Sequence, residues 1–266
     1  MAFGIPTKSA PTSEPSGRGA AVGDLVPEAR ERGRDPDGHA SAARAMFDRI
    51  APTYDVLNKV MTAGIDRRWR SRAVAALHGA PSGAALDLCA GTLDLAALLE
   101  RAYPTERVVA CDFSAKMLEL GRGKVTRTES LVADALALPF DDGAFTRVIC
   151  GFGMRNLSDL RRGLSEVRRV LAPGGVFVTL ELFAPALARS KAFHSLFAKR
   201  VLPAMGKAIA RDEEAYGYLS KSMLGFVTRG EYEDMLRDEG FSAVRGSDLT
   251  LGVASVVRAE VAGGPA

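Results

Sequence analysis

The chain has 266 residues, a formal net charge of +3 and 47% hydrophobic residues, a composition that excludes fibrous and largely disordered proteins. The nearly balanced charge and the lack of a basic groove pattern argue against a nucleic-acid substrate or partner. Three cysteines without a CxxC spacing and three histidines favour neither a metal site nor a disulfide framework. We therefore predict no bound metal and a reducing, cytoplasmic location, with Cys89, Cys111 and Cys150 as small apolar residues at strand ends.

Residues 1–40 are rich in Pro, Gly, Ser and Ala and contain almost no aromatic residues. This composition buries too little apolar surface to offset the entropy of ordering, so we predict a disordered tail over residues 1–44. The N-terminal residues lack a lysine-led apolar core, so we predict no secretory signal. The sequence has no run of about 18 apolar residues, so we predict no membrane-spanning helix. A transit peptide stays an alternative, although four acidic residues argue against it: Glu14, Asp24, Glu28 and Glu31.

Residues 45–80 are expected to form N-terminal helices with a break at Pro52. Apolar residues at helical spacing indicate two helices, and Asp66 is a candidate cap for the second. These apolar residues are Val56, Val60, Met61, Trp69, Val74 and Leu77.

Strand-like apolar runs alternate with helical stretches in the central part of the chain. Helices are expected from about residue 94, after a cap at Ser114, and from Asp159 to Leu171, where Pro173 and Gly174-Gly175 are stop signals. This alternation predicts an α/β fold with a mostly parallel sheet and helices on both faces. The predicted strands cover residues 84–88, 107–112, 130–134, 145–153 and 176–183.

The C-terminal part begins with a mostly helical segment, residues 188–240. Residues 241–260 then contain two strand-like runs with a turn near Gly246-Ser247, which predicts an antiparallel hairpin at the edge of the sheet. The whole pattern indicates a seven-stranded sheet in one domain over residues 45–260, followed by a short tail over residues 261–266.

Acidic residues fall at the ends of the first three predicted strands: Asp87, Asp112 and Asp134. In a doubly wound sheet, ligands bind outside the carboxyl ends of the strands. A carboxylate there can accept hydrogen bonds from two ribose hydroxyls, and another can accept one from an adenine amino group. The alternative is that these acids only cap helices. The pattern favours a nucleoside-containing ligand.

The turn after the first strand, CAGTLD over residues 89–94, lacks the GxGxxG pattern of dinucleotide-binding proteins. S-adenosylmethionine carries no phosphate and needs no phosphate-binding turn, so this turn favours S-adenosylmethionine over a dinucleotide. Leu93 stands where a second glycine is easier to explain. If its φ is positive, leucine is strained by about 1–2 kcal/mol. If φ is negative, the side chain points into the seam between sheet and helix.

Several segments occur in the order of one enzyme family: FDRIAPTYDVLNKVMTAGIDRRWR, LDLCAGTLDLA, DFSAKMLELGRGK, DALALPFDDGAF, GFGMRNLSD, VRRVLAPGG and VLPAMGKAIARDEEAYGYLSKSM. From about residue 45 to 258 the chain resembles the UbiE-type ubiquinone/menaquinone-biosynthesis C-methyltransferases. The resemblance implies a Rossmann-like class I methyltransferase fold and S-adenosyl-L-methionine as cofactor. It also implies methyl transfer to a ring carbon of a prenylated quinol and a helical substrate-binding insertion over residues 188–240.

The resemblance also carries cofactor-binding positions over to this chain. The family usually has GGTGD where this chain has AGTLD, so Ala90 and Leu93 depart from the pattern. Gly151 falls where many members have a serine that contacts the cofactor, and the change removes a hydroxyl. The predicted cofactor-binding residues are Asp87, Gly91, Thr92, Asp112, Asp134, Ala135 and Gly151.

Three residues are predicted to be catalytic. Arg155 and Asn156, just past the fourth strand, are expected to stabilise a phenolate or to polarise and orient a water molecule. Tyr54 is expected to cover the cofactor from the N-terminal helices. The structural alternatives are a salt-bridge arginine and a core tyrosine. His194 is a weaker candidate base, since a lone histidine on a helix is more often structural.

Residues 193–209 carry apolar side chains among lysines and arginines. At helical spacing such a stripe is usually core packing, but it could also form a lid whose basic face meets the inner face of an anionic membrane. Peripheral membrane association and a homo-oligomer therefore stay open. So do a different small aromatic acceptor and a non-catalytic scaffold, and the sequence does not separate a benzoquinol from a naphthoquinol.

Overall fold

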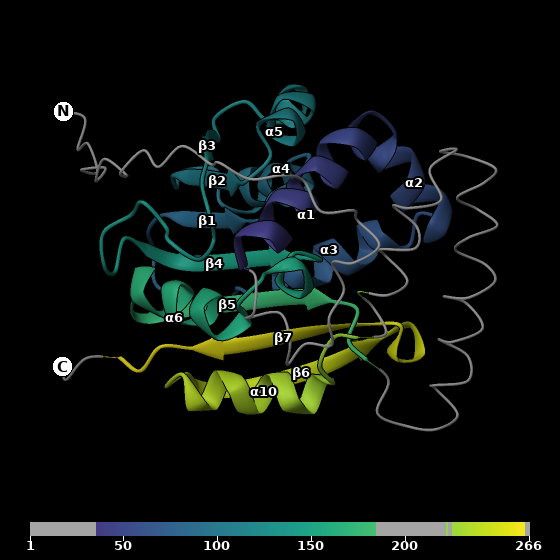
Figure 1. Ribbon diagram of the computed structural model, residues 1–266. Coiled ribbons are helices and arrows are strands. Elements are labelled where there is room, and N and C mark those ends of the chain that lie inside the picture. The colour runs from purple at the N-terminus through teal and green to yellow at the C-terminus, as the bar shows by residue number, and fades with distance from the viewer. Residues whose placement is uncertain (1–35, 185–221, 223–224, 264–266) are drawn as a thin grey trace.

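The computed structural model describes residues 36–184, 222 and 225–263 (Figure 1). It contains a seven-stranded sheet in the order β3-β2-β1-β4-β5-β7-β6. The strands β1 to β5 run parallel, and β7 is antiparallel to both β5 and β6, so the predicted sheet is confirmed. The bounds are β1 Ala85–Leu88, β2 Val108–Asp112, β3 Glu129–Val132, β4 Phe145–Gly151, β5 Leu171–Glu181, β6 Ser242–Leu249 and β7 Ala254–Glu260.

The strand order reverses beside β1, which pairs with β2 on one side and β4 on the other. Leu88 at the end of β1 is in register with Cys111 of β2 and Cys150 of β4. The carboxyl ends of these strands therefore lie together, at the switch point where open α/β sheets bind ligands.

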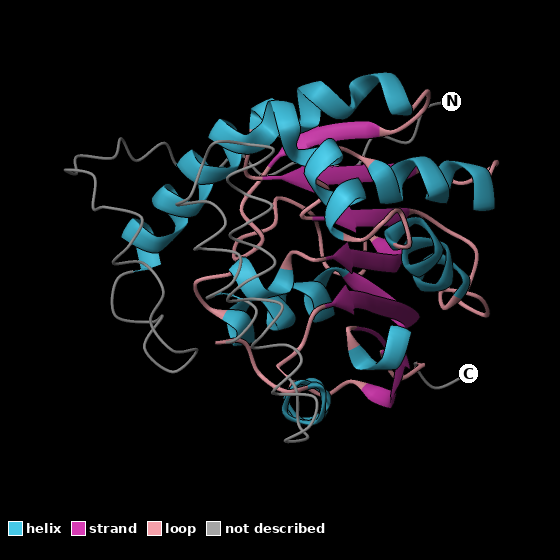
Figure 2. Cartoon of the chain, turned by 90° about the vertical axis from the view of Figure 1, so that its right-hand side faces the viewer, coloured by secondary structure: helices cyan, strands magenta, loops and turns pink. Residues whose placement is uncertain are grey.

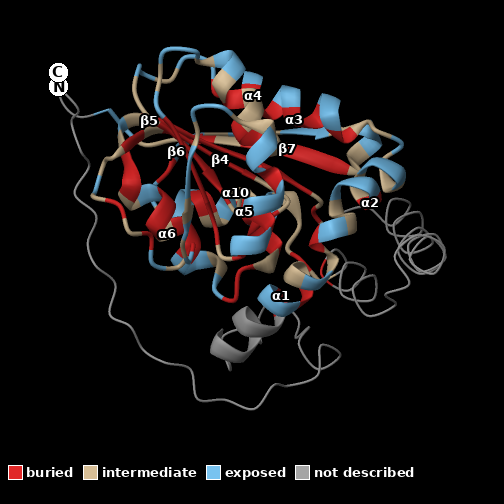
Figure 3. Ribbon diagram, turned by 90° about the horizontal axis from the view of Figure 1, so that it is seen from above, coloured by how far each residue is buried: buried red, intermediate tan, exposed pale blue. Residues whose placement is uncertain are grey.

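Helices cover both faces of the sheet (Figure 2). On one face, α3 (Asp66–Ala75) and α4 (Asp94–Ala102) bury apolar side chains against the strands. On the other face, α6 (Leu160–Val170) and α10 (Arg229–Asp238) do the same. Buried residues accordingly concentrate on the strands and on the inner sides of the helices (Figure 3). The two apolar layers fix the sheet, and hence the positions of the strand ends.

Two helices precede this layered core, α1 (Pro36–Ile50) and α2 (Tyr54–Met61). The short helix η3 (Ala51–Thr53) joins them at the predicted break at Pro52. The helix α1 begins before residue 45, where the sequence predicted the folded domain to start. In α1, Asp48 contacts the hydroxyl of Ser114, which caps α5 (Ala115–Gly121) as predicted by accepting from the backbone N–H of Met117. This contact holds the N-terminal helices near the end of β2.

The helix α6 ends at Val170, as the stop signals predicted, but β5 begins directly afterwards at Leu171, so residues 173–175 lie inside this strand, beside a register irregularity between β4 and β5. Two local predictions were wrong. Asp66 does not cap α3 but is its first residue, and the N-cap position is Ile65. The hairpin turns at η7 (Thr250–Gly252) and not at Gly246, which lies in β6. A Cβ at Gly246 would come within 2.2 Å of the Glu233 carboxylate of α10, so this glycine permits close packing.

Most of the predicted insertion, including His194 and the stripe over residues 193–209, lies outside the described residues. Within the described part of the chain, no helix is long and apolar enough to span a membrane.

Candidate active site

A first pocket opens at the carboxyl ends of β1, β2 and β4. Phe47 and Tyr54, from the N-terminal helices, also line it. Five of the predicted cofactor-binding residues line this pocket: Gly91, Asp112, Asp134, Ala135 and Gly151. The charged residues among its described lining are Asp112, Asp134 and Arg44. An excess of carboxylates suits a cationic nucleoside and not the phosphates of a dinucleotide.

Asp112 lies at the last position of β2 and is almost completely buried. Its Oδ2 accepts a hydrogen bond from the backbone N–H of Gly91 at 2.8 Å, and its Oδ1 accepts one from Ser114 at 2.8 Å. Burial raises the pKa of this carboxyl, while the backbone hydrogen bonds act in the opposite direction. The carboxylate thus joins the turn after β1 to the start of α5, and each of its oxygens can accept a further bond.

The other strand-end residues line the same pocket. Asp134 accepts a hydrogen bond from the backbone N–H of Leu136 at 2.8 Å, which fixes the loop after β3. Gly151 ends β4, and a Cβ there would lie 2.7 Å from Cδ1 of Leu95. The side chain of Leu95 therefore takes the space in which a serine at position 151 would begin.

Leu93 occupies the left-handed region of the Ramachandran plot, with φ 65° and ψ 22°, and it is the N-cap of α4. Its side chain is fully buried in the apolar layer formed with α3 and α4. Each alternative from the sequence is therefore confirmed in part. The φ of Leu93 is positive and strained, as in the first, and its side chain packs between the sheet and the helix, as in the second. The turn keeps a conformation that glycine would adopt freely, and burial of the leucine side chain offsets the strain.

Substitutions at Leu93 are expected to invert the usual order of alanine and glycine. Leu93→Gly loses the buried side chain but relieves the strain, for a net loss of about 1–3 kcal/mol in the free energy of unfolding. Leu93→Ala loses nearly the same packing and keeps the positive φ, so it should be about 1 kcal/mol less stable than Leu93→Gly. Urea unfolding of both variants checks the order. An alanine variant more stable than the glycine variant would show that the strain is negligible.

Two predicted cofactor-binding residues, Asp87 and Thr92, do not line the pocket. Asp87 is fully buried in β1, where its Oδ2 accepts a hydrogen bond from the backbone N–H of Ala96 in α4 at 2.8 Å. Thr92 donates its hydroxyl to Asp55 of α2 at 2.6 Å and accepts from Nζ of Lys124 at 3.0 Å. Both residues support the turn from outside: one ties it to α4 and the other to α2.

Burial raises the pKa of Asp87 to about 8, so this carboxyl is neutral in the folded protein at neutral pH. Because the pKa in the unfolded chain is lower, its contribution to stability is complete in acid and is lost as the pH rises towards 8. Asp87→Asn mimics the neutral form, so the stability of the variant relative to the wild type should increase by up to about 1.4 kcal/mol per pH unit between about pH 5 and pH 8. Urea unfolding across this range measures the difference, and a constant difference would contradict the assignment.

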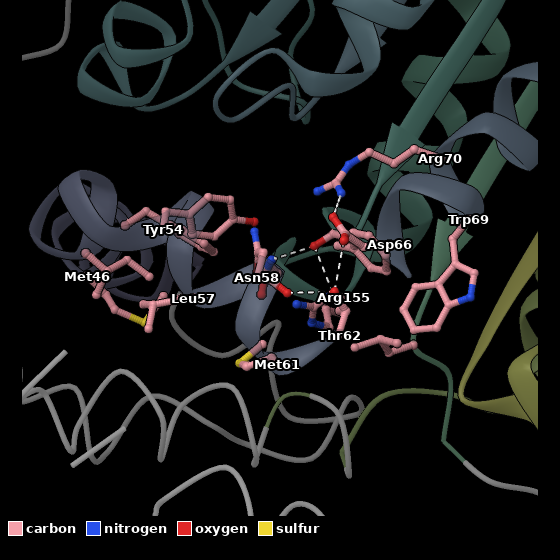
Figure 4. Close-up of a pocket in the computed structure, with 15 residues that line it drawn as sticks. Met46, Tyr54, Leu57, Asn58, Met61, Thr62, Asp66, Trp69, Arg70 and Arg155 are labelled. Carbon is pink, nitrogen blue, oxygen red and sulfur yellow. Dashed lines mark hydrogen bonds and ion pairs between the residues drawn. The ribbon is translucent and has the colours of Figure 1, made fainter. Parts of the chain in front are cut away.

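A second pocket lies beside the first, and Phe47, Tyr54, Phe152 and Asn156 line both. Figure 4 shows the second pocket with Tyr54, Asp66 and Arg155 in its wall. Its wall is mainly apolar and aromatic. The apolar residues come mostly from the N-terminal helices, α3 and the end of β5: Met46, Ile50, Leu57, Met61, Trp69 and Leu182. The polar residues are Asn58, Thr62, Asp66, Arg70 and Arg155. The three predicted catalytic residues therefore come together here: Arg155 lines this pocket, and Tyr54 and Asn156 stand between the two.

Arg155 lies in η5 (Met154–Asn156) and is almost completely buried. One of its terminal nitrogens donates to the carboxylate of Glu181, at the end of β5, and to the carbonyl of Phe152 at 2.9 Å. Asn156 donates to the same carbonyl at 3.2 Å. Glu181 is fully buried, so the guanidinium is both neutralised and held in one orientation.

Several residues in the two pockets, and one that contacts their lining, were not predicted from the sequence to have a functional role. Glu181 escaped notice although a carboxylate within the apolar run VFVTLELF is itself a sign of a buried ion pair. Arg70 and Asn58 lie in the segments used for the family resemblance, but only the packing of α2 and α3 brings them to the pocket. Cys89 and Cys111 line the first pocket, and the pKa of each thiol is raised well above its usual value, chiefly by a hydrogen bond with Cys150 for Cys89 and by burial for Cys111. The described residues contain no group of three or more side chains suited to a metal ion.

Residues 37–260 match the model of the ubiE/COQ5 methyltransferase family. The chain belongs to this family. It is 44% identical over 216 residues to a demethylmenaquinone methyltransferase of Thermus thermophilus, covering 79% of this chain and 97% of that protein. It is also 41% identical over 220 residues to a ubiquinone/menaquinone biosynthesis C-methyltransferase UbiE of Geobacter sp. strain M21, covering 80% of this chain and 93% of that protein.

Solved structures share the fold of this ubiE/COQ5-family protein. Geranyl diphosphate C-methyltransferase of Streptomyces coelicolor, in complex with S-adenosyl-L-homocysteine, superposes with a TM-score of 0.56 at 17% identity, over 76% of this chain and 82% of that one. The [4+2]-cyclase SpnF gives 0.60 at 15% identity, over 83% and 95%. At this identity the likeness shows the class I methyltransferase fold alone.

This member of the ubiE/COQ5 family is an S-adenosylmethionine-dependent C-methyltransferase of quinone biosynthesis. The first pocket fits the cofactor by its chemistry. Its carboxylates outnumber its cations, the side chains of Phe113, Met117 and Leu136 give an apolar wall, and no cluster of lysines or arginines for phosphate is present among its described lining residues.

Proposed function

We propose that this methyltransferase methylates a ring carbon of a prenylated quinol, either a demethylmenaquinol-type naphthoquinol or a methoxy-benzoquinol. The observation that carries the proposal is the pair of adjoining pockets with a shared wall of Phe47, Tyr54, Phe152 and Asn156. The names of the Thermus and Geobacter relatives support the same acceptor class.

In this proposal the first pocket holds S-adenosylmethionine, which supplies an activated methyl group when bound. Asp112 accepts hydrogen bonds from the ribose hydroxyls and Asp134 accepts one from the adenine amino group. Ala135, Gly91 and Gly151 are small and line the pocket without filling the space for the cofactor. Tyr54 covers the cofactor from α2. Asp87 and Thr92 act indirectly, because they fix the turn that carries Gly91.

The second pocket then binds the aromatic ring. Its apolar lining suits a quinol ring and the first part of a prenyl chain, while Arg155 and Asn156 supply hydrogen-bond donors for a ring oxygen. The adjoining pockets hold the ring carbon and the methyl group at contact distance, and this proximity accelerates methyl transfer. Arg155 stabilises the negative charge that develops on the oxygen when its proton leaves.

The decisive experiment combines a purified-enzyme assay with quinone analysis. The enzyme is expected to methylate a short-chain demethylnaphthoquinol or the matching benzoquinol, and a deletion strain should accumulate the demethylated quinone until it is complemented. Unchanged quinones in the deletion strain would contradict the proposal and favour another small aromatic acceptor. Absence of measurable S-adenosylmethionine binding in calorimetry would favour the scaffold alternative.

Co-sedimentation with anionic vesicles at low salt tests peripheral membrane association, and light scattering tests homo-oligomerisation.

A further inference from the structure

The second pocket contains one carboxylate among its described lining residues, that of Asp66 (Figure 4). We propose that Asp66 is a catalytic residue: it takes the hydroxyl proton of the acceptor ring as the methyl group is transferred. This inference rests on the proposed function, because it requires a phenol-type acceptor in this pocket.

The carboxylate of Asp66 is buried and held in place at both oxygens. Arg70, one turn further along α3, donates to Oδ2. On the other side, Oγ1 of Thr62 lies 2.9 Å from Oδ1 of Asp66 and 2.8 Å from the carbonyl of Asn58. A hydroxyl has one proton, so Thr62 can donate to only one of these acceptors at a time. Oδ1 therefore keeps the capacity to accept a hydrogen bond from a ligand.

The other polar groups of the pocket are poor proton acceptors at neutral pH. The guanidinium groups of Arg70 and Arg155 contain no acceptor, and the phenol hydroxyl of Tyr54 is a weaker base than a carboxylate. The side chains of Asn58, Asn156 and Thr62 do not take up a proton at neutral pH. Glu181 is a carboxylate, but it is fully buried, pairs with Arg155 and does not line the pocket.

The charges around Asp66 permit it to become neutral without leaving a cation unpaired. Arg70 lies 3.5 Å from Asp94 as well as contacting Asp66, and its guanidinium is 5.6 Å from the ring centroid of Phe152. Asp94 in turn contacts Lys124 at 2.7 Å. When Asp66 accepts a proton, Arg70 therefore retains both a carboxylate and an aromatic ring as partners. A buried cation that loses its only carboxylate partner strongly destabilises the folded protein. Arg70 does not lose its only partner when Asp66 is protonated.

The chemistry matches a carboxylate in this position. A resting phenol has a pKa near 10, so a carboxylate does not remove its proton in advance. During the reaction an electron pair of the ring carbon forms the new C–C bond to the methyl group, while the C–S bond breaks and its electrons stay on sulfur. The hydroxyl proton passes to Asp66 in the same step, and the negative charge that develops on the oxygen, which Arg155 stabilises, is delocalised to the ring carbon as its bond to the methyl group forms. The proton on the methylated ring carbon then passes to water, and the proton on Asp66 returns to the oxygen, which restores the aromatic quinol with one proton released in total.

The test compares two substitutions that each remove a carboxylate from Arg70. Asp66→Asn is expected to lower kcat about 100-fold or more, with unchanged calorimetric affinity for S-adenosylhomocysteine. The matched control is Asp94→Asn, which lies outside both pockets and should keep kcat within about threefold of the wild type. In Asp66→Ala, added formate should restore part of the rate, whereas it should not act on Asp94→Ala.

The possible results separate the role of Asp66 from the proposed function. If the wild type methylates neither quinol, the proposed function fails and the role of Asp66 fails with it. If the wild type is active and Asp66→Asn retains kcat within about twofold, only the role of Asp66 is overturned. A loss of kcat that Asp94→Asn reproduces, or that accompanies lost affinity for S-adenosylhomocysteine, assigns Asp66 to positioning instead. Lack of rescue of Asp66→Ala by formate also assigns it to positioning.

Discussion

Replacement of Asp112 by alanine is expected to weaken the binding of S-adenosylmethionine about 100-fold or more. In the proposed complex the carboxylate accepts two hydrogen bonds from the ribose, and charge-assisted bonds contribute about 1.5–3 kcal/mol each. The substitution also removes the acceptor for the backbone N–H groups of Gly91 and Ser114, so the turn after β1 and the start of α5 lose their link. Calorimetry with S-adenosylhomocysteine measures the effect directly.

The control for this prediction is the same substitution at an exposed position. Asp142 pairs with Arg169 at the surface, with 82% of its side chain exposed, and lines neither pocket. Asp142→Ala should bind the cofactor as the wild type does. Asp112→Asn keeps one acceptor oxygen and should fall between the two. Binding by Asp112→Ala within about threefold of the wild type would remove this residue from the cofactor site.

The fold was predictable from the sequence because its determinants are local and repeated. Short apolar runs alternating with amphipathic stretches leave few arrangements other than a parallel sheet covered on both faces. Asp112 and Asp134 were predictable for the same reason, because the carboxyl ends of the strands in such a sheet lie at the edge where ligands bind. The hairpin turn was misplaced because Gly246 looks like a turn residue, whereas it is needed for contact with α10.

The parts of the site that escaped prediction depend on contacts between distant segments. The sequence marked Leu93 as unusual, but only the packing of α3 and α4 around it explains how a leucine is kept at positive φ. Thr92 fits the family pattern, yet its hydroxyl is directed to Asp55, and this contact exists only once α2 lies across the turn. Asp66 was predicted as a helix cap from its position before an apolar pattern, while its partners Thr62 and Arg70 place it in the second pocket.

Replacement of Arg155 by alanine is expected to have two separable effects. The first is on stability, because Glu181 then stays fully buried without its cation, which typically costs about 3–5 kcal/mol. The second is on catalysis, because the proposed oxyanion loses a donor, and removal of such a donor lowers kcat about 100-fold or more. Unfolding in urea measures the first effect, and kcat at saturating cofactor and quinol measures the second.

The two effects of Arg155 can be divided by a second substitution and a matched ion pair. Adding Glu181→Gln removes the stranded charge, so the double variant should regain much of the stability while kcat stays low. Arg147→Ala breaks another buried arginine–glutamate pair, with Glu106, near the amino end of β4 and away from both pockets. It should destabilise the protein without lowering kcat of the folded enzyme. If the double variant recovered wild-type kcat, the guanidinium would serve only to neutralise Glu181, and stabilisation of the oxyanion would fall to Asn156 and Tyr54.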